Sequence, residues 1–222
     1  MGGKEEVVLF DPEIRRKANR RKPSVVAVVF IVAIVVLASM SMLLGGLAQH
    51  YHDSKYRSQY WQVVSLSNAI SFSQSGIAGS VDPNATIGER YGSGIYAQSN
   101  LVEAEDLSYS IQLMYPDGSE ESVTLLSVHA TMRNAELMMW RINDRLDDWL
   151  MYNTTYEFNA TVLSSVSKVL DLMHDLANLV YDGVDQNRDF IDHPYSLVKR
   201  MNLSEITNVC SQTDDICREI LT

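Results

Sequence analysis

The longest apolar stretch of the chain lies near its N-terminus and contains no charged residue. It runs from Ser24 to Ala48 with the sequence SVVAVVFIVAIVVLASMSMLLGGLA. At about 1.5 Å of rise per residue, a helix of this length crosses the ~30 Å hydrocarbon core of a bilayer. We therefore predict a transmembrane helix over residues 24–48, with a tail at 1–23 and an extracytoplasmic domain at 49–222 on opposite sides of the membrane.

Helical periodicity continues beyond this predicted span. Tyr60, Val63 and Ile70 fall on one stripe at three- and four-residue steps, which predicts a helical stalk over 49–72. The next part of the chain is rich in Gly, Ser and Asn and contains a Pro, a composition typical of a surface loop. We predict such a loop over 73–107.

Apolar and polar residues then alternate on both sides of the triplet Pro116-Asp117-Gly118. Alternation with period two around such a triplet is typical of a β-hairpin, which we predict over 108–128. A hairpin alone is only marginally stable in water, so its apolar face has to pack against another element. The alternating apolar positions are Tyr109, Ile111, Leu113 and Tyr115 before the turn, and Val123 and Leu125 after it.

Two longer segments repeat apolar residues at alternating steps of four and three. The first runs from Val128 to Trp149 and the second from Val162 to Val180. A short polar gap separates them, so the pattern predicts an antiparallel helical hairpin over 129–182 whose apolar stripes face each other.

A shorter helical pattern occupies the C-terminal segment, where we predict helices over 195–222. The predicted fold class is mainly α, with a single transmembrane helix continuing into a helical stalk and an ectodomain that holds the helical hairpin and one β-hairpin. Roughly 170 residues follow the span, enough for one ordinary domain with its own core.

The charges of the chain separate at the span. Residues 1–23 carry seven Lys or Arg and four Asp or Glu, whereas the part beyond the span carries eleven and twenty-four. Because basic residues favour the cytoplasmic side, we predict a type II signal-anchor protein of the cell membrane or endomembrane, with its N-terminus in the cytoplasm. The acidic ectodomain lacks the basic surface that nucleic acid requires, which excludes nucleic acid as a partner.

Cleavage of the apolar segment is the alternative to a permanent anchor. Gly46 and Ala48 have the small size that a signal peptidase requires before its cleavage site. The apolar run is longer than the ~7–15 residues usual in a secretory signal, which favours the anchor.

Four N-x-S/T sequons lie beyond the span, a mild excess over chance that makes a glycoprotein our prediction. Asn and Thr also recur at turns and helix caps, so a purely structural explanation stays open. The glycosylation candidates are Asn84, Asn153, Asn159 and Asn202.

Cys210 and Cys217 are the two cysteines of the chain. On one unbroken helix their separation spans about 10.5 Å, beyond the ~7 Å limit on Cα spacing for a disulfide bond. We predict a Cys210–Cys217 disulfide made feasible by a helix break at Thr213, the alternative being two inert buried thiols.

The sequence contains no recognisable nucleophile turn, phosphate-binding Gly-rich loop or metal-binding motif. We therefore predict no catalytic residue, no cofactor and no metal, and a non-catalytic accessory, scaffolding or adhesion subunit. Its partners would be the membrane lipid bilayer and a protein, either another chain or its own copies as a homo-oligomer. A pilin-like filament subunit and a ligand-sensing ectodomain are the alternatives.

Overall fold

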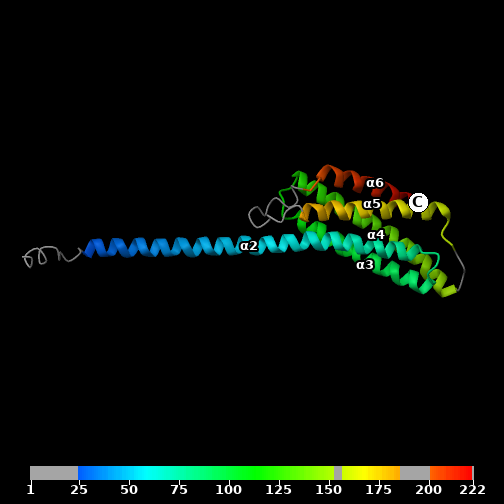
Figure 1. Ribbon diagram of the computed structural model, residues 1–222, viewed down its shortest axis with the longest axis horizontal. Coiled ribbons are helices and arrows are strands. Elements are labelled where there is room, and N and C mark those ends of the chain that lie inside the picture. Colours follow the sequence, from blue (N-terminus) through cyan, green and yellow to red (C-terminus); the bar gives the residue numbers. More distant parts are fainter. Residues whose placement is uncertain (1–24, 153–156, 186–200, 222) are drawn as a thin grey trace, which may run out of the picture. The chain divides into compact units, whose positions relative to one another are not determined.

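The computed structural model describes residues 25–152, 157–185 and 201–221 (Figure 1). Within these ranges the regular structure is entirely helical, which confirms the mainly α class. The chain divides into two compact units, Met1–His52 and Asp53–Thr222. The helices are α2 (Val25–Val81), α3 (Ile87–Gln112), α4 (Glu120–Tyr152), α5 (Ala160–Asp185) and α6 (Leu203–Leu221).

The first unit contains the apolar part of α2. Val28–Tyr51 has a mean hydropathy of 2.8, is long and apolar enough to cross a membrane, and is nowhere buried within the protein. The same length and composition also suit a signal sequence, so the structure establishes an apolar N-terminal helix rather than a membrane topology.

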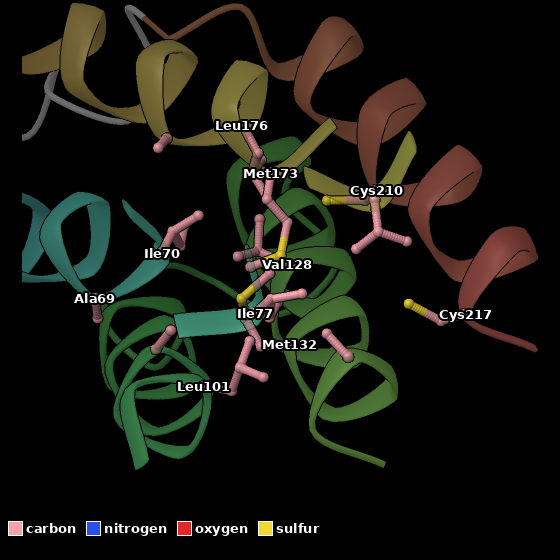
Figure 2. Close-up of a cluster of buried hydrophobic side chains, with 14 of the residues drawn as sticks. Ala69, Ile70, Ile77, Leu101, Val128, Met132, Met173, Leu176, Cys210 and Cys217 are labelled. Carbon is pink, nitrogen blue, oxygen red and sulfur yellow. The ribbon is translucent and has the colours of Figure 1, made fainter. Parts of the chain in front are cut away.

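The second unit is a bundle in which α3 to α6 and the later part of α2 surround one core. Close backbone approaches join α3 to α4, α4 to α6, and α5 to α6. The later part of α2 lies against α3 at Gly76 and against α5 at Ser67, whose hydroxyl donates to the Ala177 carbonyl oxygen at 2.9 Å. Around the core the order is therefore α2, α3, α4, α6, α5 (Figure 2).

Side chains from all these helices meet in the centre of the bundle (Figure 2). Burying each of the larger ones removes enough apolar surface from water to stabilise the fold by about 1.5–3 kcal/mol. Met132 of α4 and Met173 of α5 thus belong to a common core. Fully buried examples are Ile70 and Ile77 of α2, Leu101 of α3, Val128 and Met132 of α4, and Met173 and Leu176 of α5.

The predicted stalk is helical throughout, but its second half does not stand apart from the domain. Within α2, Val63, Leu66 and Ile70 are buried in the core of the second unit. The stripe that predicted a stalk is therefore the inward face of a bundle helix.

The two long helices predicted over 129–182 are confirmed as α4 and α5, and the predicted pairing between them is corrected. α6 packs closely along both α4 and α5, so they share a neighbour instead of forming the expected close pair. Their apolar stripes are wide enough to meet α6 as well as the core.

The loop predicted over 73–107 is wrong. α2 continues to Val81, a short turn follows, and α3 begins at Ile87. The glycines and serines that suggested a loop allow the two helices to approach. A Cβ added at Gly76 would lie 2.8 Å from backbone atoms of Ala97 and Ser93. Only the turn around Pro83 interrupts the helices here.

The β-hairpin predicted over 108–128 is also wrong, because α3 ends at Gln112 and α4 begins at Glu120. The turn itself is where the sequence placed it. Ser119 N–H donates to the Pro116 carbonyl oxygen at 3.1 Å, and Gly118 has a φ of 77°. The flanks are helical because small residues such as Ala104 and Ser108 continue the buried stripe, whereas the alternation depended partly on exposed apolar residues.

Candidate functional site

Three of the four glycosylation candidates lie on exposed positions at helix ends. Asn84 lies in the turn between α2 and α3, Asn159 directly precedes α5, and Asn202 directly precedes α6. Asn153 lies outside the described residues. The three described asparagines therefore lie at the surface, where a bulky group on the side chain would have room.

Two of these asparagines also cap helices. The Val162 N–H donates to Asn159 Oδ1 at 2.7 Å, and the Glu205 N–H donates to Asn202 Oδ1 at 3.3 Å. A side-chain oxygen in this position satisfies one of the otherwise unpaired N–H groups of the first helical turn. Capping thus supplies a structural reason for Asn at both positions.

The third sequon overlaps a cap through its threonine. Thr86 Oγ1 accepts from the Glu89 N–H at 3.3 Å, and Glu89 Oε2 accepts from the Thr86 N–H at 2.8 Å. These two hydrogen bonds form a capping box at the start of α3. Hydrogen bonds from the Thr86 backbone and side chain lower the pKa of Glu89.

The predicted disulfide is wrong, because α6 runs unbroken from Leu203 to Leu221 and both cysteines are free and buried. Thr213 caps no helix; it is buried within α6, and its hydroxyl donates to the Val209 carbonyl oxygen at 2.8 Å. Burial raises the pKa of both thiols to about 12. They are therefore packing residues rather than reactive groups.

The adjacent helices α3 and α4 each carry exposed apolar side chains. We call this set the α3–α4 apolar face and define it by Ile95, Val102, Leu137 and Trp140, each more than one-third exposed. Trp140 is the most exposed of the four, at 57%. Clusters of this kind on one face of a protein often mark a surface for a partner.

Side-chain contacts between α3 and α4 join the two helices near these residues. Asn143 Nδ2 donates to Gln98 Oε1 at 3.2 Å, and Arg133 Nη1 donates to Glu105 Oε1 at 3.1 Å. Glu105 also contacts His129 of α4, whose Nε2 lies 3.6 Å from the same Glu105 oxygen. The face is therefore held on two helices whose relative register is fixed.

Acidic residues outnumber basic residues among the sequence neighbours of the α3–α4 apolar face. On α3 they follow Val102, and on α4 they precede Leu137 and follow Trp140. One of the two nearby arginines, Arg133, is already paired with Glu105. The acidic residues are Glu103, Asp106, Glu136 and Asp144, and the arginines are Arg133 and Arg141.

A groove of about 270 Å³ opens at the end of the bundle that holds the α2–α3 turn. Both the α2–α3 turn and the start of α5 contribute to its walls, so chain segments far apart in sequence form it together. We call it the Arg90 groove. Its lining residues are Val81, Pro83, Ile87, Arg90, Glu157, Phe158 and Leu163.

Arg90 is the unusual residue of this groove, because its side chain is charged and the residue is only 8% exposed. Its Nε donates to the Ser80 carbonyl oxygen at 3.1 Å. The guanidinium carbon lies 5.5 Å from the ring centre of Trp149 and 5.2 Å from that of Phe158, within the range of cation–π attraction. Burial lowers the pKa of Arg90, and the carboxylates of Asp82 and Glu157 oppose that shift.

None of the site residues predicted from the sequence lines the Arg90 groove. Arg90 fell within the predicted loop, and Phe158 lies in the connection before α5, so no periodicity marked either residue. A buried arginine between aromatic rings leaves no linear signature, since Trp149 is 59 positions away in the sequence. Among the described residues, no group of three or more His, Cys, Asp or Glu side chains is arranged to hold a metal ion.

Comparison of this chain with models of protein families, with curated proteins and with solved structures finds no match. Its function therefore has to be inferred from its own residues and their arrangement. The α3–α4 apolar face and the Arg90 groove are the two features available for that inference.

Proposed function

We propose that this chain is a non-catalytic, single-pass membrane protein of the cell membrane or an endomembrane, with its N-terminus in the cytoplasm. Its helical ectodomain would bind another protein and act as an accessory, scaffolding or adhesion subunit. The observation that carries this proposal is the α3–α4 apolar face, which exposes Trp140 and three aliphatic side chains to solvent.

The apolar helix supports the membrane part of the proposal. Val28–Tyr51 is long and apolar enough to cross a bilayer. Basic residues are concentrated before the helix and acidic residues after it, which supports a cytoplasmic N-terminus. Use of the sequons as glycosylation sites is part of the same proposal, because their asparagines would then lie on the extracytoplasmic side.

Charge favours a different protein over a second copy as the partner. Two copies would bring the same acidic residues together, and each ectodomain has more than twice as many acidic as basic residues. Like charges placed face to face disfavour association. We therefore infer a partner with an apolar centre and a basic rim, in which Trp140 inserts as the central anchor.

Site-specific crosslinking tests this proposal. A photo-crosslinking amino acid at Leu137 in the full-length protein, activated in native membranes, is expected to capture one predominant protein whose contact surface is basic. Trp140→Asp should reduce that capture by about tenfold or more, because it places a charge where an apolar anchor is needed. Raised salt should weaken capture as well.

Trp61 provides a matched control, since it is a similarly exposed tryptophan, at 63% against 57% for Trp140, on α2 rather than on this face. Trp61→Asp should leave capture at the wild-type level. The proposal is wrong if Trp140→Asp has no effect or if both substitutions reduce capture equally. Capture of its own copies alone would identify a homo-oligomer and overturn the basic partner.

A further inference from the structure

The Arg90 groove has the composition of a small-ligand site and is separate from the α3–α4 apolar face. Five of its seven lining residues are apolar, and the charged ones are Arg90 and Glu157. Its volume of about 270 Å³ lies just below the range typical of ligand pockets, which begins at about 300 Å³. A groove of this size suits a compact molecule with a small apolar body.

Arg90 supplies a directional anion-binding group in this groove. A guanidinium group has five N–H donors, and the Nε donor is engaged by the Ser80 carbonyl oxygen. Within the described ranges, no hydrogen bond satisfies the donors of its two terminal nitrogens. Arg90 is 8% exposed as a residue and lines the groove, so an anionic acceptor bound there could pair with its terminal nitrogens.

The surrounding charges favour a carboxylate over a phosphate. Asp82 and Glu157 are close enough to Arg90 to act on it electrostatically. Both carboxylates oppose an added anion, and they oppose a dianion about twice as strongly as a monoanion. A carboxylate also matches the guanidinium fork with two parallel hydrogen bonds.

We propose that the Arg90 groove binds a monocarboxylate with a small apolar body. The carboxylate would accept hydrogen bonds from the terminal nitrogens of Arg90, and the apolar body would lie against Ile87 and Leu163. A free organic acid and the C-terminal carboxylate of a peptide share this chemistry. This binding is independent of the protein-binding role of the α3–α4 apolar face.

Calorimetry or ligand-observed NMR on the full-length protein in detergent micelles tests the proposal. The probes are 4-methylpentanoate, its uncharged amide, and the tripeptide acetyl-Ala-Ala-Leu with either a free or an amidated C-terminus. We expect each acid to bind at least about tenfold more tightly than its amide, equivalent to ~1.4 kcal/mol. The tighter of the two acids identifies the source of the carboxylate.

Two variants separate binding from folding. Arg90→Gln should abolish the preference for acid over amide, although it also removes contacts to Trp149 and Phe158 and so affects stability. Leu163→Trp fills the apolar part of the groove without altering Arg90, and should weaken acid binding about tenfold or more. Leu150→Trp, an exposed position on α4 outside the groove, is the matched control and should bind like wild type.

The proposal is overturned if the wild-type protein binds neither acid, if acids and amides bind equally, or if Leu163→Trp binds as well as Leu150→Trp. Loss of binding in Arg90→Gln counts only when its unfolding transition remains cooperative. These outcomes do not depend on crosslinking at Leu137, so failure of the groove proposal and failure of the protein-binding proposal are distinguishable.

Discussion

Individual side chains at the helix ends of this protein serve structure whether or not they are modified. Asn159 caps α5 through its Oδ1 atom, whereas a glycan would be attached to its side-chain nitrogen. The capping oxygen therefore remains available after modification. The sequon and the cap can be separated by substitution, because Thr161 belongs to the sequon only.

We predict that Asn159→Gln and Thr161→Ala remove the same glycan but differ in stability. Asn159→Gln also removes the cap and should lower the free energy of unfolding by about 1 kcal/mol. Electrophoretic mobility after expression in a glycosylating host, combined with urea unfolding of the unglycosylated variants, distinguishes the two effects. Equal loss of stability in both variants would contradict the capping role.

The two cysteines lead to a prediction about reactivity and pH. Cys210 and Cys217 are 1% and 0% exposed, and burial raises the pKa of both thiols from 9.0 to about 12. We expect neither to react with iodoacetamide near pH 8 until the protein unfolds. Mass spectrometry with and without denaturant measures this, and loss of two hydrogen atoms in the unreduced native protein would instead reveal a disulfide.

The same pKa shifts predict how stability depends on pH. Below pH 9 the folded and unfolded states both keep the thiol protons, and the cysteines contribute no pH dependence. Between pH 9 and about 12 the unfolded state loses them first, so the free energy of unfolding falls as pH rises. Urea unfolding at a series of pH values measures this decline. In the double variant Cys210→Ala/Cys217→Ala, the free energy of unfolding should lack this part of its fall between pH 9 and about 12.

At the scale of elements, the contact between α2 and α3 depends on small residues. A Cβ at Gly76 would meet backbone atoms of α3, which cannot move aside as a side chain could. We predict that Gly76→Ala lowers the free energy of unfolding by about 1–3 kcal/mol. Thermal and urea unfolding measure the change.

Gly92 is the control for this substitution. It is an exposed residue within α3, and a Cβ added there meets no atom within 4 Å. Gly92→Ala should therefore stabilise the protein by about 0.5–1 kcal/mol through helix propensity. If both alanine variants are stabilised alike, the close approach of α2 and α3 is wrong.

The close contact between α2 and α3 also explains why some helices could be predicted from the sequence and α3 could not. Large apolar residues at steps of three and four identified α4 and α5 correctly, because such residues dominate their buried faces. In α3 the buried face consists largely of Ala97, Leu101, Ala104 and Ser108, and small residues carry little periodic signal. Glycine and serine therefore suggest a loop in the sequence, whereas in the structure they permit close helix packing.

The candidate sites could be predicted only where they coincide with a linear motif. The sequons are visible in the sequence, and the described acceptors are exposed as expected for their use. The Arg90 groove depends on tertiary contacts, because Arg90 meets Trp149 and Phe158 only after α3, α4 and the start of α5 have packed. The disulfide prediction failed because Thr213 continues the helix instead of beginning one.

At the scale of the whole molecule, the proposed topology predicts how the protein behaves in membranes. The full chain should stay in the membrane pellet after extraction with alkaline carbonate. Protease added to sealed cells should digest residues 49–222 and spare the tail at 1–23, and epitope tags at both ends report the two outcomes. Permeabilised cells serve as the control, because the tail then becomes accessible too.

Mass spectrometry of the mature N-terminus tests the rival to this topology. An intact tail is expected for a permanent anchor, whereas a mature chain starting after Ala48 would identify a cleaved signal. The pilin-like alternative also requires processing near the apolar segment. Release of the whole chain by alkaline carbonate would contradict the proposal that the apolar helix anchors this protein in a membrane.

The position of α6 between α4 and α5 has a consequence for biosynthesis. A ribosome completes α2 to α5 before it reaches residues 203–221, and until then the inward sides of α4 and α5 have no shared neighbour. Until α6 emerges, the sides of α4 and α5 that it covers are exposed on the nascent chain, a condition that promotes aggregation and chaperone binding. Closure of the core is therefore a late event in synthesis, and we expect a chain that ends before α6 to be less stable than the full-length protein.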